Sequence, residues 1–340
     1  MRALALVTGA TGMLGSYIVD ELLAEGRRVR ALVRDRGRAS FLAARGVELA
    51  SGSLDDAASL VVAARGCDVL FHAAAEIGSG DAWERFRSGN VEGTANVVEA
   101  ACAHGARLVH VSSTAVFGAA RYRDTPTDER VPLPELPEHD AYGRSKQAAE
   151  RIVLGAHAAG RLRATVVRPP VMYGRRDRQF VPRVGPVLRR GTFPLIGGGR
   201  TTLTLVHAGS VARGAVLAAR TDRAAGRVYH LTNDFPVDTR TLVRCAAEGL
   251  GVRVRGVHVP RAAGRAGFAG LALALRMVGR GDLARHAGGT FDMLTRDNPF
   301  SSARARAELG WSPDVRPETA LTEAFRWWHE CGERDTGKGR

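Results

Sequence analysis

The stretch Thr8-Gly9-Ala10-Thr11-Gly12-Met13-Leu14-Gly15 decides the fold of this 340-residue chain. It follows a short apolar run at residues 3–8, which predicts a buried strand, and it leads into residues 14–25, which have helical apolar spacing. Glycines between a strand and a helix allow a tight turn and close approach of the backbone to a pyrophosphate. The helix N-terminus adds unpaired N–H groups and partial positive charge. The sequence therefore predicts a dinucleotide-binding turn.

The remaining chain alternates strands and helices, which favours an α/β fold with a Rossmann-type, doubly wound parallel sheet. Further strands are expected at 28–33, 67–73, 107–113 and 162–168, and helices at 56–65, 81–104 and 141–159. We expect residues 1–170 to form a dinucleotide-binding domain, to which 200–235 return. Residues 171–330 should form a smaller, substrate-binding α/β part, and 334–340 a disordered tail.

Composition excludes several classes of protein. The formal charge is +14, but only two of the 49 basic residues are lysines, and the arginines are spread through every segment without a basic, aromatic-rich stripe. We therefore expect no nucleic-acid partner. No uncharged apolar run approaches about 20 residues, so no integral membrane span is expected. The four cysteines are far apart, and the chain starts directly with a strand; a reduced, cytoplasmic protein without a metal site is expected.

Tyr142-Gly143-Arg144-Ser145-Lys146 begins a predicted helix. Residues at i and i+4 share one helix face, so the phenol and the ammonium can point the same way. A tyrosine titrates near ~10, but a cation about 4 Å away at an effective dielectric of ~20 contributes ~4 kcal/mol, or roughly three pKa units. With two lysines in the chain, chance is a poor explanation. The pair predicts an acid–base site for carbonyl–alcohol chemistry.

Ser112 and Ser113 end the strand before that helix. Ligands of open α/β sheets bind beyond the carboxyl ends of strands, where a hydroxyl can hold a substrate oxygen. Strand-end serines can instead satisfy backbone groups, which is plausible for one of the two.

The end of the second strand selects the cofactor, because an acidic residue there binds the adenosine ribose 2′-hydroxyl and an arginine pairs with a 2′-phosphate. Arg34 falls at this position, and Arg36 and Arg38 add charge. NADP(H) is therefore favoured. Asp35 could rotate in and accept a 2′-hydroxyl, which keeps NAD(H) as the alternative.

The glycine loop, the paired serines and Tyr142-x-x-x-Lys146 together resemble the extended short-chain dehydrogenases/reductases. That family includes nucleotide-sugar epimerases and dehydratases, 3β-hydroxysteroid dehydrogenases and dihydroflavonol 4-reductases. The likeness covers most of the chain, including His72-Ala-Ala-Ala75, residues 90–96, Arg168-Pro-Pro and residues 303–313. It implies that Ser113 is the catalytic hydroxyl, Tyr142 the acid–base residue and Lys146 its partner.

The same resemblance implies the cofactor and substrate contacts. The implied cofactor-binding residues are Gly9, Thr11, Gly12, Met13, Leu14, Gly15, Arg34, Ser53, Leu54, Ala73, Ala74, Ala75, Asn90, Ser112, Tyr142, Lys146 and Pro169. Substrate contacts are expected from Ser113 and Tyr142 and, by position only, from Glu76, Trp83, Tyr173 and Phe180.

Three departures from the family pattern bear on the substrate. Val171 replaces the asparagine of nucleotide-sugar enzymes, Thr114-Ala115 replaces the Asp-Glu pair of dehydratases, and Ser53 replaces an acidic residue near the adenine. They favour a ketoreductase or alcohol dehydrogenase that acts on a small to medium, fairly apolar carbonyl or alcohol. Two alternatives stay open: a nucleotide-sugar epimerase or 4-ketoreductase with tightly bound NAD, and a non-catalytic NADP(H)-sensing protein.

Three further expectations concern surfaces. The arginines of residues 175–190 could hold an anion, although compositional bias explains them better. The apolar stretch 267–279 is expected to be a buried helix, with a pocket wall or contact with a membrane surface as alternatives. The family resemblance implies a homodimer formed by the helices 81–104 and 141–159.

Overall fold

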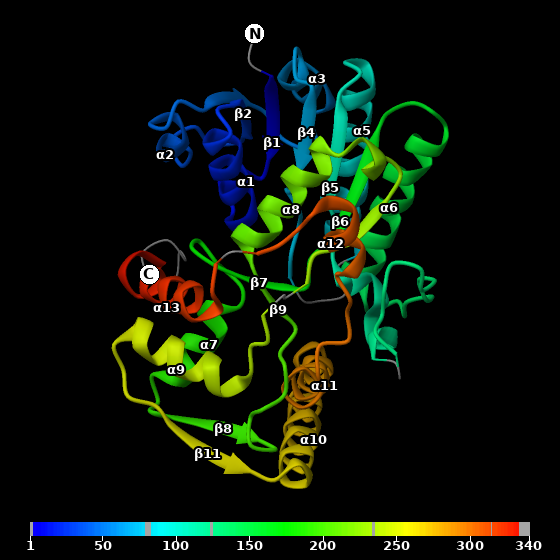
Figure 1. Ribbon diagram of the computed structural model, residues 1–340. Coiled ribbons are helices and arrows are strands. Elements are labelled where there is room, and N and C mark those ends of the chain that lie inside the picture. Colours follow the sequence, from blue (N-terminus) through cyan, green and yellow to red (C-terminus); the bar gives the residue numbers. More distant parts are fainter. Residues whose placement is uncertain (1–2, 79–82, 123–124, 233–234, 314, 333–340) are drawn as a thin grey trace.

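The computed structural model describes residues 3–78, 83–122, 125–232, 235–313 and 315–332. Its centre is a seven-stranded parallel sheet in the order β10-β6-β5-β4-β1-β2-β3 (Figure 1). The strands are β1 Leu4–Thr8, β2 Arg28–Val33, β3 Glu48–Ser51, β4 Val69–His72, β5 Arg107–Val111, β6 Ala164–Arg168 and β10 Val228–His230. The predicted Rossmann-type fold is confirmed.

Helices cover both faces of this sheet. On one face lie α1 Met13–Ala24 and α8 Ala208–Arg220, and on the other α3 Ala57–Ala64, α5 Gly93–Ala103 and α6 Ala141–Ala158. In β1, Ala5 and Val7 face the first layer while Leu4 and Leu6 face the second, because successive side chains of a strand alternate. A sheet buried on both faces explains why β1 is apolar throughout.

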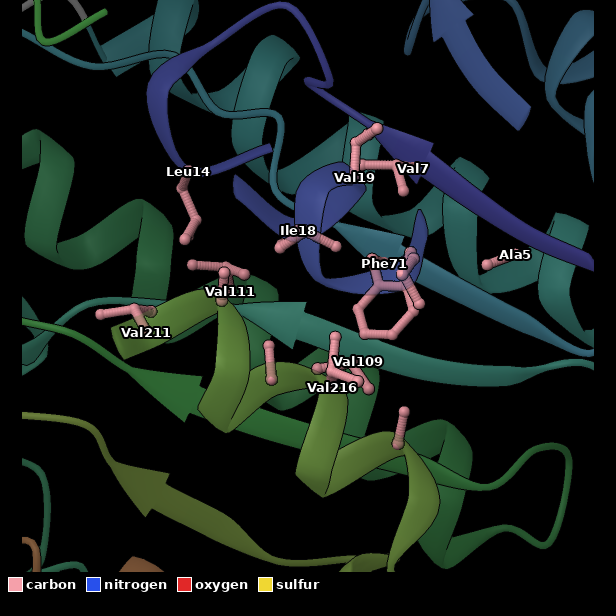
Figure 2. Packing of buried hydrophobic residues seen from close by; sticks show 14 of the residues in the cluster. Ala5, Val7, Leu14, Ile18, Val19, Phe71, Val109, Val111, Val211 and Val216 are labelled. Atoms are coloured by element: carbon pink, nitrogen blue, oxygen red, sulfur yellow. The ribbon is translucent and has the colours of Figure 1, made fainter. Parts of the chain in front are cut away.

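The first layer shows how sequence spacing produces the packing. Leu14, Ile18 and Leu22 recur every four residues and give α1 one apolar face. Figure 2 shows Leu14 and Ile18 of α1 with Phe71 of β4, Val109 of β5 and the valines of α8, all in one cluster. This packing fixes the start of α1 against the carboxyl end of β1.

The predicted strands and helices of the first 170 residues are confirmed to within two residues, with three exceptions. The strand β3 and the short helix α2, Ser40–Ala43, were not predicted; both are four residues long and half-exposed, so they carry little periodicity. The expected helix 81–104 is divided into α4 Trp83–Phe86, a π-helical segment Arg87–Glu92 (η1) and α5, and residues 81–82 lie outside the described residues.

A smaller part lies beyond the carboxyl edge of the sheet (Figure 1). It has two parallel strand pairs, and its own apolar core lies between three helices. The pairs are β7 Val171–Tyr173 with β9 Leu205–His207 and β8 Thr192–Ile196 with β11 Arg255–Val259; the helices are α7 Val181–Leu188, α9 Thr239–Leu250 and α13 Pro317–Trp327. The chain returns to the large sheet through α8 and β10, and α12, Ala303–Leu309, also packs there.

Residues 267–279 correct one expectation. They lie mostly in α10, Arg261–Met277, which pairs with α11, Gly281–Thr295. Only Gly264 of α10 is buried. The prediction of a buried helix was wrong, because α11 covers one side of α10 and the fold leaves the rest exposed. The expected tail 334–340 lies outside the described residues.

Candidate active site

Tyr142 and Lys146 lie in the first turns of α6. Asp140 begins the helix by accepting a hydrogen bond from the Gly143 N–H at 3.0 Å. Lys146 is buried, and its Nζ donates to the carbonyl oxygen of Val111 at 3.0 Å. Since Val111 is the last residue of β5, this bond ties the ammonium to the carboxyl end of the sheet.

Ser113 joins the same group. It follows β5 and caps the 3-10 helix Thr114–Arg121 (η2) by accepting from the Ala115 N–H at 3.1 Å, and its hydroxyl lies near enough to the half-buried Tyr142 to lower the pKa of the phenol. The structure therefore brings together the serine, the tyrosine and the buried lysine that the sequence selected.

The pKa values of this group differ from the sequence-based expectation. Burial raises the pKa of Tyr142 to about 12, while the nearby Ser113 hydroxyl acts in the opposite direction. Burial lowers the pKa of Lys146 to about 8, opposed by the nearby Glu150 carboxylate. Lys146 was expected to lower the pKa of Tyr142. Among the protein's own groups desolvation dominates instead, and the ammonium is turned to the Val111 carbonyl.

Glu150, one helical turn after Lys146 on α6, forms a buried ion pair with Arg168 at the end of β6. Arg168 donates to both carboxylate oxygens, at 2.8 and 2.6 Å. Sequence reasoning missed this pair. The spacing of Glu150, four residues after Lys146 and eight after Tyr142, was a usable signal, because it places the three side chains along one helix face.

The glycine loop fits a dinucleotide. Gly9 has a φ of +72°, and a Cβ there would lie 2.7 Å from the backbone N of Ala74. A Cβ on Gly15 would lie 2.1 Å from the Gly9 carbonyl oxygen. Gly12 caps α1 without a side chain, so the first N–H groups of the helix are left for a ligand. Of the implied contacts, Thr11 lies in this turn, and Met13 and Leu14 are the first two residues of α1.

Hydrogen bonds between polar side chains fix the segment Ala73 to Glu76, which lies next to the glycine loop. We call this segment the wall of the site. Thr8 Oγ1 is bonded to His72 Nδ1 at 2.8 Å and accepts from the Ala74 N–H at 3.3 Å. Burial lowers the pKa of His72 to about 3, so this histidine is neutral. The predicted cofactor residues Ala73, Ala74 and Ala75 thus follow a rigid strand end.

Asn90 lies in the π-helical segment and brackets the same wall. Its Oδ1 accepts from the Glu76 N–H at 2.7 Å, and its Nδ2 donates to the Glu76 carbonyl and to Ser145 Oγ, both at 3.0 Å. With its amide used in this way, Asn90 positions the wall relative to α6. Single π-helical turns are frequent at functional sites.

The strand-end residues at the adenosine side are also resolved. Arg34 is exposed directly after β2. Asp35 Oδ1 accepts from the N–H groups of Gly37 and Arg38, at 2.8 and 3.2 Å, so this carboxylate closes its own turn. Arg36 donates to the Leu49 carbonyl at 3.0 Å. The nearby Ser53 hydroxyl lowers the pKa of the Asp55 carboxyl, and Leu54 is half-buried.

Ser112 and Pro169 directly follow the neighbouring strands β5 and β6. Ser112 is buried, and within the described part of the chain its hydroxyl has no hydrogen-bond partner. Pro169 is buried too, and its carbonyl accepts from the Thr114 N–H at 3.0 Å. A buried hydroxyl without a partner at this edge suits a bound polar molecule.

The expected substrate contacts fall into two groups. Glu76 forms an ion pair with Arg85, and the Arg144 guanidinium lies 4.7 Å from the ring centre of Trp83. Phe86, which the sequence did not single out, lies edge-on to Tyr142 with ring centres 6.0 Å apart.

Tyr173 and Phe180 belong to the smaller part instead. Tyr173 is buried against His207, with ring centres 5.7 Å apart. Phe180 is half-buried, and its N–H donates to the buried Asp177, which also accepts from the N–H of Val181, the first residue of α7. Arg175 contacts Tyr17 and Arg176 lies over Phe41, and both line one cavity together with Arg45, whereas Arg189 lies over Trp328. The arginines of 175–190 therefore do not all meet in one anion site.

The sheet, the glycine loop and the group at its carboxyl edge define a nicotinamide-dinucleotide-dependent oxidoreductase. The model of the NAD dependent epimerase/dehydratase family matches residues 5–231. The chain belongs to this family, the extended short-chain dehydrogenases/reductases, and acts as an NAD(P)-dependent oxidoreductase on a CH–OH or C=O group. Among the described residues, no helix has the length and apolarity needed to cross a bilayer.

Two curated relatives cover nearly the whole chain. A 4-hydroxy-2-methyl-3-oxo-4-farnesyl-3,4-dihydroquinoline-1-oxide ketoreductase of Stigmatella aurantiaca is 35% identical over 96% of this chain and 97% of its own. A 2-alkyl-3-oxoalkanoate reductase of Stenotrophomonas maltophilia is 30% identical, over 93% and 96%.

Two solved structures agree with these matches. The crystal structure of gox2253 has a TM-score of 0.73 and 29% identity and covers all of both chains. The dTDP-glucose 4,6-dehydratase DesIV of Streptomyces venezuelae, in a structure with NAD bound, has a TM-score of 0.72 at 25% identity over 97% of this chain and 98% of its own.

Proposed function

We propose that this protein is an NADP(H)-dependent ketoreductase that interconverts a carbonyl and a secondary alcohol on a fairly apolar substrate. The observation that carries the proposal is the bond from Lys146 Nζ to the Val111 carbonyl, which fixes Lys146, and Tyr142 one helical turn before it, beside Ser113 at the end of β5. In this arrangement a hydroxyl, a proton donor and a cation meet at the carboxyl edge of the sheet.

The residues divide the work as follows. The bound cofactor supplies or removes hydride at the carbonyl carbon. In the reducing direction Tyr142 gives its phenolic proton to the substrate oxygen, and the Ser113 hydroxyl stabilises the negative charge that develops there. A pKa raised to about 12 keeps Tyr142 protonated at neutral pH, as a proton donor must be. Lys146 supplies a nearby positive charge and a donor for the nicotinamide ribose.

NADP(H) is proposed over NAD(H) because of the turn after β2. Asp35 is the residue that could accept a ribose 2′-hydroxyl, and its Oδ1 is engaged with the Gly37 and Arg38 N–H groups. Arg34 remains at the strand end, where a guanidinium can pair with a 2′-phosphate. A homodimer through the helices around 81–104 and 141–159 is part of the same proposal.

The substrate class rests on the side chains near Tyr142 and on the relatives. Phe86 is buried against the Tyr142 ring and Trp83 is half-buried, so the α4 side of Tyr142 is aromatic. Both curated relatives are named as reductases of oxo compounds, one with a farnesyl group and one with alkyl chains. We therefore propose a 3-oxo compound with a hydrocarbon substituent as the substrate.

The test is a cofactor and substrate assay of the purified protein. NADPH consumption with 2-alkyl-3-oxoalkanoates, lost in Tyr142→Phe while NADPH binding by calorimetry is kept, would support the proposal. Mass spectrometry would detect NAD that co-purifies. Retained NAD together with interconversion of UDP- or dTDP-sugars would replace the proposal by an epimerase. NADPH binding without turnover of any oxo compound would favour a sensor.

A further inference from the structure

The exposed apolar side chains of this protein are concentrated in one place. Among the described residues eight large hydrophobic side chains are exposed, and four of them lie within residues 271–278. They are Leu271, Leu273, Met277 and Val278, which are 51%, 57%, 74% and 70% exposed. A cluster of this kind marks an interaction surface rather than chance exposure.

The helix α10 uses only one side for the fold. Phe268 packs on Phe291 of α11 with ring centres 5.6 Å apart, and Leu275, seven residues further, lies on the same side and is half-buried. Leu273 and Met277, four residues apart, point away from it. Leu271, four residues before Leu275, borders the side that faces α11, and Val278 follows the helix. We call the exposed side of α10 that carries Leu273 and Met277 the outer face of α10.

Positive charge flanks this outer face. Arg261, Arg265 and Arg276 are separated by four and eleven residues, about one and three helical turns, and therefore form one stripe. Arg280 follows the helix, and residues 261–281 contain no acidic residue. An exposed apolar face beside an arginine stripe is complementary to a surface with hydrocarbon below and negative charge above.

The α10–α11 hairpin is joined to the candidate active site. It lies at the end of the molecule opposite α3 (Figure 1). Arg296, directly after α11, lies over the Tyr122 ring at 4.2 Å, and Thr127 exchanges backbone hydrogen bonds with Pro299 and Ser301. These contacts reach the segment that follows Ser113 and η2, so a surface bound by α10 would lie on the substrate side of the molecule.

We propose that the outer face of α10 docks the enzyme on an anionic lipid bilayer, with the helix lying in the interface. Its 17 residues are too few to cross a hydrocarbon core, which takes about 20. Docking would bring the active site to apolar carbonyl compounds dissolved in the bilayer. The docking itself does not depend on the proposed function and can be tested without turnover.

The experiment is co-sedimentation of the purified full-length protein with lipid vesicles. Vesicles of phosphatidylcholine with phosphatidylglycerol should bind the protein more tightly than phosphatidylcholine alone, and added salt should weaken the binding. Leu273→Glu with Met277→Glu should reduce binding to the anionic vesicles at least about tenfold. Arg276→Glu should remove the preference for the anionic lipid.

Two controls keep the test sharp. Val62→Glu changes an exposed valine of α3, at the other end of the molecule, and should leave vesicle binding unchanged. NADPH binding and thermal unfolding of each variant show that it is folded. Absence of vesicle binding, or binding unaffected by the double substitution, overturns the proposal. So does a double variant whose only change is from dimer to monomer in light scattering, because the outer face would then bind a second copy.

Discussion

The carboxylate of Glu150 accepts two hydrogen bonds from the guanidinium of Arg168, and both side chains are almost fully buried. The pair joins α6 to the end of β6. Because Glu150 follows Lys146 by one helical turn, its negative charge also raises the pKa of that ammonium against the effect of burial. Stability and protonation of the active site are therefore linked through one residue.

Glu150→Gln should lower the free energy of unfolding by about 3 kcal/mol, because it leaves the buried Arg168 charge without its partner. The matched control is Glu99→Gln, which breaks the exposed pair between Glu99 and Arg161 and should cost less than about 1 kcal/mol. Urea unfolding of the two variants measures the difference. An equal loss of unfolding free energy in both variants would show that the buried pair stabilises the fold no more than the exposed pair does.

The same Glu150→Gln variant should change the pH profile of the reaction. Without the carboxylate the pKa of Lys146 falls below about 8, so the ammonium is lost at a lower pH. The alkaline limb of kcat/KM should then move to lower pH, while Glu99→Gln keeps the wild-type limb. A profile that only falls in amplitude would mean that Glu150 acts through folding alone.

Lys146→Met should change how stability depends on pH. Folding lowers the pKa of Lys146 from 10.5 to about 8, so the unfolded chain binds the proton first as the pH falls. Native stability from this group is present above pH 10.5 and is lost as the pH falls to about 8, by about 3 kcal/mol in total. Relative to Lys146→Met, the wild type should gain stability as the pH rises through this window. If the free energies of unfolding of the wild type and of Lys146→Met change with pH in the same way, the pKa of Lys146 is not lowered.

Gly9→Ala and Gly26→Ala form a matched pair, since both glycines have a φ near +70°. Each substitution should lower the free energy of unfolding by about 1 kcal/mol, because alanine adopts the left-handed conformation less readily than glycine. Only at Gly9 would the Cβ meet backbone, 2.7 Å from the Ala74 N, whereas nothing lies within 4 Å at Gly26. Gly9→Ala should therefore also weaken NADPH binding at least about tenfold. Calorimetry checks this, and equal affinity in both variants would remove Gly9 from the cofactor site.

Arg34→Asp should weaken NADPH binding by about ten- to hundredfold and leave NADH binding unchanged or improved, because only NADPH carries the 2′-phosphate. Arg36→Ala is the control, since Arg36 is bonded to the Leu49 carbonyl. Titration calorimetry with both cofactors distinguishes the outcomes. A loss shared by both cofactors would give Arg34 a structural role, and no loss would favour NAD.

Most of the fold of the first 170 residues could be predicted from local pattern. Alternation of short apolar runs with helical spacing is a property of consecutive residues, so β1, α1 and α6 are readable without a structure. The four-residue β3 was missed because half-exposed edge strands carry too little pattern. The serine, tyrosine and lysine of the candidate site were selected from type and spacing. The ion pair of Glu150 and Arg168 was not predicted, since residues 18 positions apart form a pair only when α6 lies on β6.

The sequence by itself determined the glycine turn after β1 and the tyrosine and lysine at the carboxyl edge of the sheet. Both depend on local geometry: glycine permits the tight turn, and the spacing of four residues places Tyr142 and Lys146 on one helix face. Only the tertiary structure decided that burial, rather than Lys146, dominates the pKa of Tyr142. It also decided that Asp35 closes its own turn and that the apolar α10 lies outside the core. Burial and partner choice depend on what packs against a residue, and an apolar helix looks the same in sequence whether its neighbours cover it or leave it exposed.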